Sequence, residues 1–151
     1  CPPFQVVGAW SEPVAALMAE ALAGLGLERA FVVHGADGWD EATPVGPFIC
    51  FEVRNGGVER AVRDPLGAGI GRCLASDLLG GDAASNAARL AAALQGGDTQ
   101  AHRDALALGA GLALEVCGIA ADLSEGVALA RAAMADGRAK DALARLVSYR
   151  E

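Results

Sequence analysis

The sequence predicts an α/β fold in which short parallel strands and a hairpin are packed by helices, followed by an all-helical C-terminal half. Three observations support this class. Residues 4–35 have the pattern of strand, helix and strand, which is a βαβ unit with a parallel pair. A strong turn signal, Asn55-Gly56-Gly57, then joins two apolar runs into an antiparallel hairpin. From Asp82 onward the apolar spacing is helical and no further strand pattern occurs.

The first three elements differ in their apolar pattern. "FQVVGAW", residues 4–10, begins as a short strand that we expect to be buried. Residues 11–26 predict a helix with Ser11 as cap and Pro13 in the first turn. "RAFVVHG", residues 29–35, is apolar without alternation, as expected of a strand covered on both faces. The apolar positions with helical spacing in the predicted helix are Val14, Leu17, Met18, Ala21, Leu22 and Leu25.

The later elements are set by turns and caps. "PFICFEVRNGGVERAV", residues 47–62, predicts the hairpin, and residues 64–82 form an irregular glycine-rich link. Four helices follow: one capped by Asp82, one capped by Thr99, one starting at Ser124, and a last one that finishes the chain. This helical surface is large for so small a sheet, so the sequence resembles part of a larger α/β domain.

Composition limits the function classes. The 151 residues are 53% hydrophobic and only 5% aromatic, which predicts one domain with a core of Leu, Val and Ala. A formal charge of -7, from 12 Lys and Arg against 19 Asp and Glu, disfavours a nucleic-acid partner. No apolar run reaches the roughly 18 residues of a membrane span, and no signal peptide opens the chain, so we expect a soluble protein.

The cysteines and histidines give no metal-ligand pattern. Because the four cysteines are widely spaced, without a CxxC, and stand mostly among apolar neighbours, we expect buried free thiols in a cytoplasmic protein. Zinc is not expected, since neither histidine has ligand spacing with them. We expect His34 to be a hydrogen-bonded structural group and His102 to be solvated. The cysteines are Cys1, Cys50, Cys73 and Cys117.

The candidate site is an adjacent acid pair, Asp40 and Glu41, in the loop after the second strand. The carboxyl end of a parallel strand is where open α/β sheets place ligands, and Gly35 and Gly38 let backbone come close. Such a pair suits Mg²⁺, which takes one or two carboxylates and completes its shell with water and phosphate oxygens. Two solvated loop acids are the alternative, and local chemistry alone favours it. Trp39 either shields the acids from water or packs the loop.

Two other glycine-rich stretches have a simpler interpretation. "LGAGIG", residues 66–71, does not stand between a strand and a helix start as a phosphate loop requires. "GGDAASN", residues 80–86, could offer NH groups to an anion, but a turn followed by the Asp82 cap explains it better. We expect Asn86 to bond to a neighbouring loop.

Several stretches in combination resemble the C-terminal portion of the anthranilate phosphoribosyltransferase family, over essentially the whole chain. The stretches are "QVVGAWSEPVAALMAEALAGLGLERA", "RAFVVHGADGWDEATPVGP", "DLLGGDAASNAARLAAALQG" and "SEGVALARAAMADGRAKDALARLV". The resemblance implies a partial nucleoside phosphorylase/phosphoribosyltransferase-like α/β domain. It also implies that Asp40 and Glu41 coordinate Mg²⁺ on the diphosphate of phosphoribosyl pyrophosphate (PRPP). The family's reaction moves the phosphoribosyl group from PRPP to the amine of anthranilate in tryptophan biosynthesis, with release of diphosphate.

The resemblance also predicts how the chain relates to a whole enzyme. The family's GTGGD loop, its KHGN segment and the arginine that meets the anthranilate carboxylate all precede the matching region. We therefore expect residues 1–151 to be the C-terminal part of one α/β domain, with the N-terminal helical domain and the first half of that domain missing. This part alone is expected to be inactive, and the complete enzyme to be a cytoplasmic homodimer. A nucleoside phosphorylase-like paralogue and a non-catalytic binding or assembly module remain alternatives.

Overall fold

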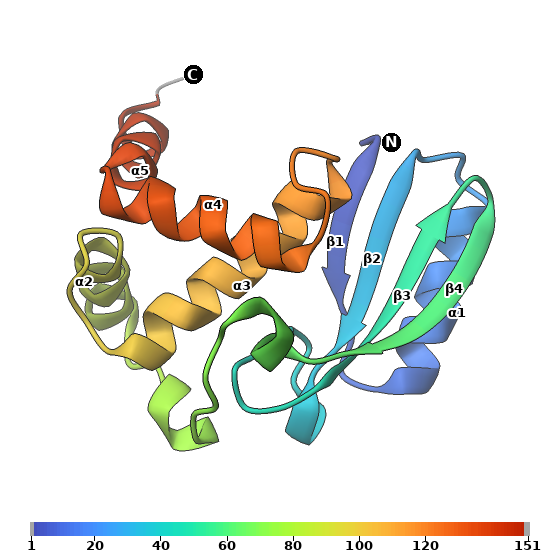
Figure 1. Cartoon of the computed structure of the whole chain (residues 1–151), viewed down its shortest axis with the longest axis horizontal. Coiled ribbons are helices and arrows are strands. Elements are labelled where there is room, and N and C mark those ends of the chain that lie inside the picture. The colour runs from blue at the N-terminus through green and yellow to red at the C-terminus, as the bar shows by residue number, and fades with distance from the viewer. Residues whose placement is uncertain (1, 150–151) are drawn as a thin grey trace.

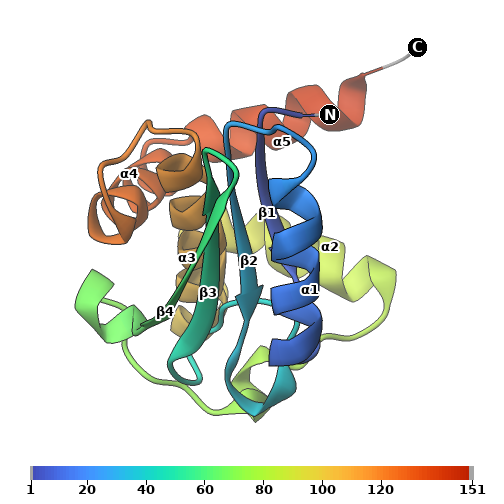
Figure 2. The same cartoon turned by 90° about the vertical axis from the view of Figure 1, so that its right-hand side faces the viewer.

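The computed structural model describes residues 2–149 and shows a mixed four-stranded sheet with helices on both faces (Figures 1 and 2). The strands are β1 (Phe4–Gly8), β2 (Arg29–His34), β3 (Phe48–Arg54) and β4 (Gly57–Arg63). The α-helices are α1 (Glu12–Ala23), α2 (Ala83–Ala93), α3 (Gln100–Val116), α4 (Leu123–Ala135) and α5 (Arg138–Ser148). Three short 3₁₀ turns are η1 (Ala36–Gly38), η2 (Pro65–Ala68) and η3 (Ala75–Leu78). The predicted α/β class, with a helical C-terminal half, is confirmed.

The sheet follows chain order, β1-β2-β3-β4. β1 and β2 are parallel, while β2–β3 and β3–β4 are antiparallel. The hairpin turns at Asn55 (φ 53°) and Gly56 (φ 74°), two successive left-handed residues, as the sequence signal predicts. Because β1 and β2 are parallel, the carboxyl ends of both strands lie at the same end of the sheet, where the candidate loop begins.

One face of the sheet is covered by α1 (Figure 2). Ala15 and Ala19, four residues apart, are fully buried against the strands, and their small side chains let the helix lie close to the sheet. Leu17 is 70% exposed, so the predicted apolar stripe is wrong at this position. The spacing identified the helix, but the contact with the sheet is centred on alanines.

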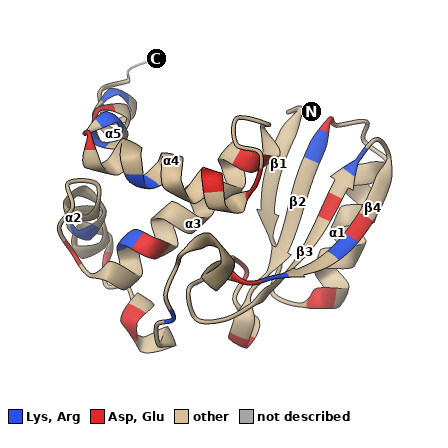
Figure 3. Cartoon of the chain, viewed as in Figure 1, with Lys and Arg blue, Asp and Glu red and all other residues tan. Residues whose placement is uncertain are grey.

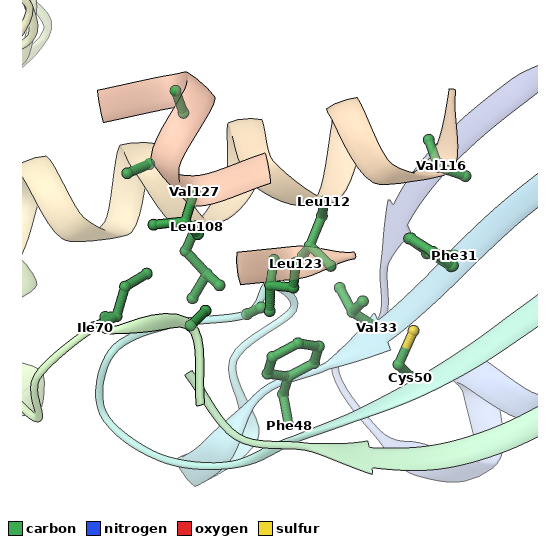
Figure 4. Packing of buried hydrophobic residues seen from close by; sticks show 14 residues of the cluster. Phe31, Val33, Phe48, Cys50, Ile70, Leu108, Leu112, Val116, Leu123 and Val127 are labelled. Atoms are coloured by element: carbon green, nitrogen blue, oxygen red, sulfur yellow. The ribbon is translucent and has the colours of Figure 1, made fainter. Parts of the chain in front are cut away.

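The opposite face packs against α3 and α4 (Figure 4). Phe31 and Val33 of β2 point to this face, whereas Ala30 and Val32 point to α1. Both sets are buried, which is why β2 is apolar without alternation. Phe48, Leu108, Leu112 and Val127 complete the larger core on this side.

The first strand and two helix starts differ from expectation. β1 is an edge strand, and Val6 is 39% exposed, so the prediction of a buried strand is wrong. Ser11 occupies the cap position of α1, but its side chain makes no capping bond. The helix predicted to begin at Ser124 begins one residue earlier, because the Asp122 side chain accepts a bond from the Glu125 amide at 2.9 Å.

The described cysteines have three different environments. Cys50 is buried in the core, and burial raises the pKa of its thiol to about 11. Cys73 is half-buried, while Cys117 is exposed, so the expectation of buried thiols is wrong for Cys117. Cys1 lies outside the described residues.

Charged residues are distributed over separate strands and helices (Figure 3). The view shows acidic and basic residues interspersed on the strands and along the helices.

Within residues 2–149, no helix is both long and apolar enough to cross a membrane.

Candidate functional site

The acid pair lies in the loop that joins β2 to β3. The loop turns back through Asp37 (φ 58°) and Gly38 (φ 83°), and the Gly35 amide donates to the Trp39 carbonyl oxygen at 2.8 Å. Asp40 and Glu41 follow this closed turn, immediately beyond the carboxyl end of β2. The sequence prediction of their place in the fold is therefore confirmed.

Two hydrogen bonds fasten the strand ends beneath the loop. His34 donates through Nδ1 to the Ala9 carbonyl oxygen at 2.9 Å, and the Ala9 amide donates to the Val33 carbonyl oxygen at 2.9 Å. The prediction that His34 is hydrogen-bonded is confirmed. The bonds give the loop a rigid base on both parallel strands.

Both carboxylates are unpaired; Asp40 is exposed, and Glu41 is exposed but partly covered by its surroundings. No hydrogen bond or ion pair links Asp40 or Glu41 to another side chain in the part of the chain that the structure describes. Partial burial, and then the nearby charge of Asp40, raise the pKa of Glu41. Two like charges without a basic partner repel each other, so a bound cation would relieve the repulsion.

Residues 35–47, which join β2 to β3 and carry Asp40 and Glu41, are called the acid loop. Glu41 borders a cavity of about 320 Å³ between this loop and the helices. One wall is formed by Trp39, Glu41 and Thr43, and the other walls come from the region of η3, from α2 and from the segment that begins α3. Trp39 is half-buried and lines this cavity beside Glu41. The further lining residues are Leu78, Gly80, Asn86, Arg89, Leu90, Ala93, Asp98, His102, Ala105 and Leu106.

A polar cluster inside this cavity was not predicted. His102 donates through Nδ1 to Asp98 at 2.8 Å, and its Nε2 lies 3.0 Å from the Arg89 guanidinium, which also bonds the Leu79 carbonyl oxygen. The His102 side chain is only 17% exposed, so the expectation of a solvated histidine is wrong. The spacing of Asp98 and His102, four residues apart, is the sequence signal that could have identified the pair.

The acid pair fits a divalent cation shared with a phosphorylated ligand. Mg²⁺ accepts one or two carboxylates and retains waters or substrate phosphate oxygens in its other positions. Asp40 and Glu41 supply two such carboxylates with no competing arginine or lysine among the described residues. Between Pro2 and Tyr149, no group of three or more histidine, cysteine or acidic side chains is placed to hold a metal ion. The donor set therefore suits a metal that a ligand helps to bind.

The two glycine-rich stretches form turns. Asn86 exchanges two hydrogen bonds with the backbone of Gly81, at 2.8 and 3.0 Å, which confirms its predicted bond to a neighbouring loop. Asp82 caps α2 by accepting from the Ser85 amide at 2.8 Å, also as predicted. In residues 66–71 the chain forms part of η2 and the left-handed turn at Gly69.

Comparison with known proteins shows which family the chain resembles. The family model described as "Glycosyl transferase family, a/b domain" matches residues 1–140. Anthranilate phosphoribosyltransferase from Rubrobacter xylanophilus is 47% identical over 143 residues, covering 95% of this chain and 42% of that protein. The chain thus spans about two-fifths of the length of the curated relatives that it matches.

Solved structures share the fold. Anthranilate phosphoribosyltransferase from Thermus thermophilus superposes with a TM-score of 0.84 at 38% identity, covering 93% of this chain and 41% of that one. The Saccharomyces cerevisiae enzyme in complex with PRPP and Mg superposes with a TM-score of 0.83 at 22% identity, covering 93% of this chain and 40% of that one.

Proposed function

The chain belongs to the glycosyl transferase family with this α/β domain, and from this membership we propose that it serves in an anthranilate phosphoribosyltransferase. In this proposal residues 1–151 act as the C-terminal part of the α/β domain, and Asp40 and Glu41 are the carboxylates that hold Mg²⁺ on the diphosphate of PRPP. The 47% identity to an enzyme of that name supports the assignment.

One observation carries the proposal. Two adjacent, partner-free carboxylates stand beyond the carboxyl end of a parallel strand, and one of them borders a cavity. Several other acids of the chain are paired with arginines: Asp64 with Arg72 at 2.7 Å, for example, and Glu12 with Arg60 at 2.7 Å. An unpaired acid pair at this edge is suited to a cation and its ligand.

The proposed reaction transfers a phosphoribosyl group to an amine. The amine nitrogen of anthranilate forms a bond to C1 of the ribose, the bond from C1 to diphosphate breaks, and the diphosphate leaves with that electron pair while the amine loses a proton. Asp40 and Glu41 would hold the ion, which when bound would neutralise the negative charge that grows on the leaving diphosphate. The hydrogen bonds at the strand ends keep the loop of these two acids in place.

The same family membership guides the proposed partners. We propose PRPP and anthranilate as substrates, and a cytoplasmic homodimer as the assembly of the natural enzyme. The identity of 38–47% to anthranilate phosphoribosyltransferases supports the substrates. The homodimer and the cytoplasmic location follow from the sequence resemblance to that family.

Calorimetry tests the proposed metal role. Mg²⁺ together with PRPP is titrated into the full-length protein that contains this chain and into its Asp40→Asn, Glu41→Gln variant, and we expect the variant to lose the binding heat. Asp37→Asn is a matched control, because Asp37 is an exposed acid of the same loop and asparagine tolerates its left-handed backbone. The control should bind as the natural protein does. Equal heats from the natural protein and the double variant would rule the role out.

A further inference from the structure

We propose that Gly8 and Gly35 are positioning residues that set the place of the two proposed metal-binding carboxylates. This inference rests on the proposed function of Asp40 and Glu41. Gly8 ends β1 and Gly35 follows β2, so the two glycines stand at the carboxyl ends of the two parallel strands.

The end of β1 has no room for a side chain, because the backbone of Asp40 occupies that space. A Cβ atom at Gly8 would lie 1.4 Å from the Asp40 carbonyl oxygen and 2.6 Å from its carbonyl carbon. Backbone atoms cannot rotate away as the tip of a flexible side chain can. The acid loop therefore rests directly on β1 at Asp40.

Gly35 has the same relation to the next acid. A Cβ atom there would lie 2.1 Å from the Glu41 carbonyl oxygen and 3.1 Å from Cβ of Trp39. The two adjacent acids thus each press a backbone carbonyl against a glycine, one glycine from each strand end. These two contacts fix the distance of the acid pair from the sheet and the direction in which the loop runs at that point.

Glycine is required at these two positions because there is no room for a side chain, and not because the backbone conformation is unusual. Gly35 has φ −81° and ψ 168°, which any residue can adopt, and Gly8 is not among the residues with positive φ. The requirement comes from the acid loop itself. Alanine can adopt the backbone conformation at either position, so the effect of its methyl group would be to displace the acid loop.

The physical consequence is a displaced metal site. To restore an ordinary van der Waals distance from a methyl group at position 8, the Asp40 carbonyl would have to move by about 2 Å. Mg²⁺ requires near-ideal octahedral geometry, so a shift of this size takes at least one carboxylate out of reach. Displacing groups that support metal ligands typically weakens metal affinity about 10- to 100-fold.

Mn²⁺ is the probe, because its electron paramagnetic resonance signal reports free ion directly. The full-length protein that contains this chain and its Gly8→Ala and Gly35→Ala variants are titrated with Mn²⁺ in the presence of PRPP. We expect at least about tenfold weaker Mn²⁺ binding in both variants, with thermal unfolding showing that each is folded. Gly71→Ala is the matched control: this exposed loop glycine has no positive φ and nothing within 4 Å of an added Cβ, so binding should not change.

The outcomes separate this inference from the proposed function. Folded alanine variants that bind Mn²⁺ as well as the natural protein overturn the positioning role. Failure of both variants to fold also overturns it, since the glycines would then serve the fold as a whole. If the full-length protein that contains this chain binds no Mn²⁺ with PRPP, or if its Asp40→Asn, Glu41→Gln variant binds it normally, the proposed function itself is wrong.

Discussion

At the scale of single residues, the acid pair differs from the buried acids of the chain in its lack of partners. Glu115 and Asp104, for example, are buried and bound by arginines, whereas Asp40 and Glu41 have no basic partner among residues 2–149. Partial burial disfavours the charged form of Glu41, and the neighbouring charge of Asp40 adds to this effect. The pKa of Glu41 is therefore raised first by burial and second by the adjacent charge of Asp40.

This raised pKa predicts how metal binding depends on pH. Protons compete with the metal for Glu41, so Mn²⁺ affinity should be full above the Glu41 pKa and should fall as pH falls through it. Because that pKa is raised, the loss begins at a higher pH than for an ordinary glutamate, whose pKa is about 4.3. Mn²⁺ titrations over a pH series measure the loss, and a carbon-detected NMR titration of the metal-free protein locates the Glu41 pKa.

Asp40→Asn provides the control for this prediction. The change removes the second cause of the shift and leaves the first, which is burial, so the Glu41 pKa should decrease but stay above its ordinary value. A Glu41 pKa that is ordinary in the natural protein would contradict the proposed electrostatics.

At the scale of elements, the close crossing of α3 and α4 organises the helical half. The helices meet at Gly111 and Gly126, where a Cβ on Gly126 would lie 2.5 Å from the Gly111 carbonyl oxygen and 2.9 Å from its Cα. Both glycines are buried. Their backbones can approach only because neither has a side chain, and α4 can then cover Leu108 and Leu112.

Gly126→Ala should therefore destabilise the fold. We expect a loss of about 1–3 kcal/mol in the free energy of unfolding, because the methyl group overpacks a contact between two backbones. Gly109→Ala is the matched control on α3: it is exposed, nothing lies within 4 Å of the added Cβ, and it should stabilise the helix by about 0.5–1 kcal/mol. Urea denaturation of both variants measures the difference, and equal effects would show that the crossing is loose.

At the scale of the whole molecule, an ion network joins the sheet to the helical half. Glu115 of α3 accepts from Arg63 of β4 at 2.5 Å, and its carbonyl oxygen accepts from Arg29 of β2 at 2.7 Å. Arg29 also pairs with Glu52 of β3 at 2.7 Å. Arg29 and Arg63 lie over the ring of Phe31, at 4.8 and 5.4 Å from its centre. One end of the interface between the sheet and α3 is therefore held by charge as well as by apolar packing.

Glu115→Gln should reduce the stability of the whole fold. The change leaves Arg63 without its charged partner in a mostly buried position, so we expect a loss of roughly 3 kcal/mol in the free energy of unfolding. Glu12→Gln is the same substitution in the more exposed pair with Arg60 and should cost at most about 1 kcal/mol. Chemical denaturation distinguishes the two, and a Glu115→Gln variant as stable as Glu12→Gln would show that the network contributes little.

Much of the architecture could be predicted from local signals. The βαβ start, the hairpin at Asn55 and the caps at Asp82 and Thr99 depend on neighbouring residues, and all are confirmed. The place of the acid pair after β2 was also predictable, because it follows from the order of elements along the chain. The start of α4 was predicted at the wrong residue because two adjacent signals, Asp122 and Ser124, compete for one cap.

The remaining features depend on contacts between residues far apart in the sequence. Sequence spacing could not show that α1 packs through Ala15 and Ala19, that His102 is bound inside a cavity, or that Gly8 faces Asp40. By itself, the sequence determined which segments form strands and helices and which acids stand at a strand end, because hydrogen bonding, capping and side-chain period act within a few residues. Only the tertiary structure decided which faces meet and which carboxylates stay unpaired, because packing and electrostatics depend on distances in space.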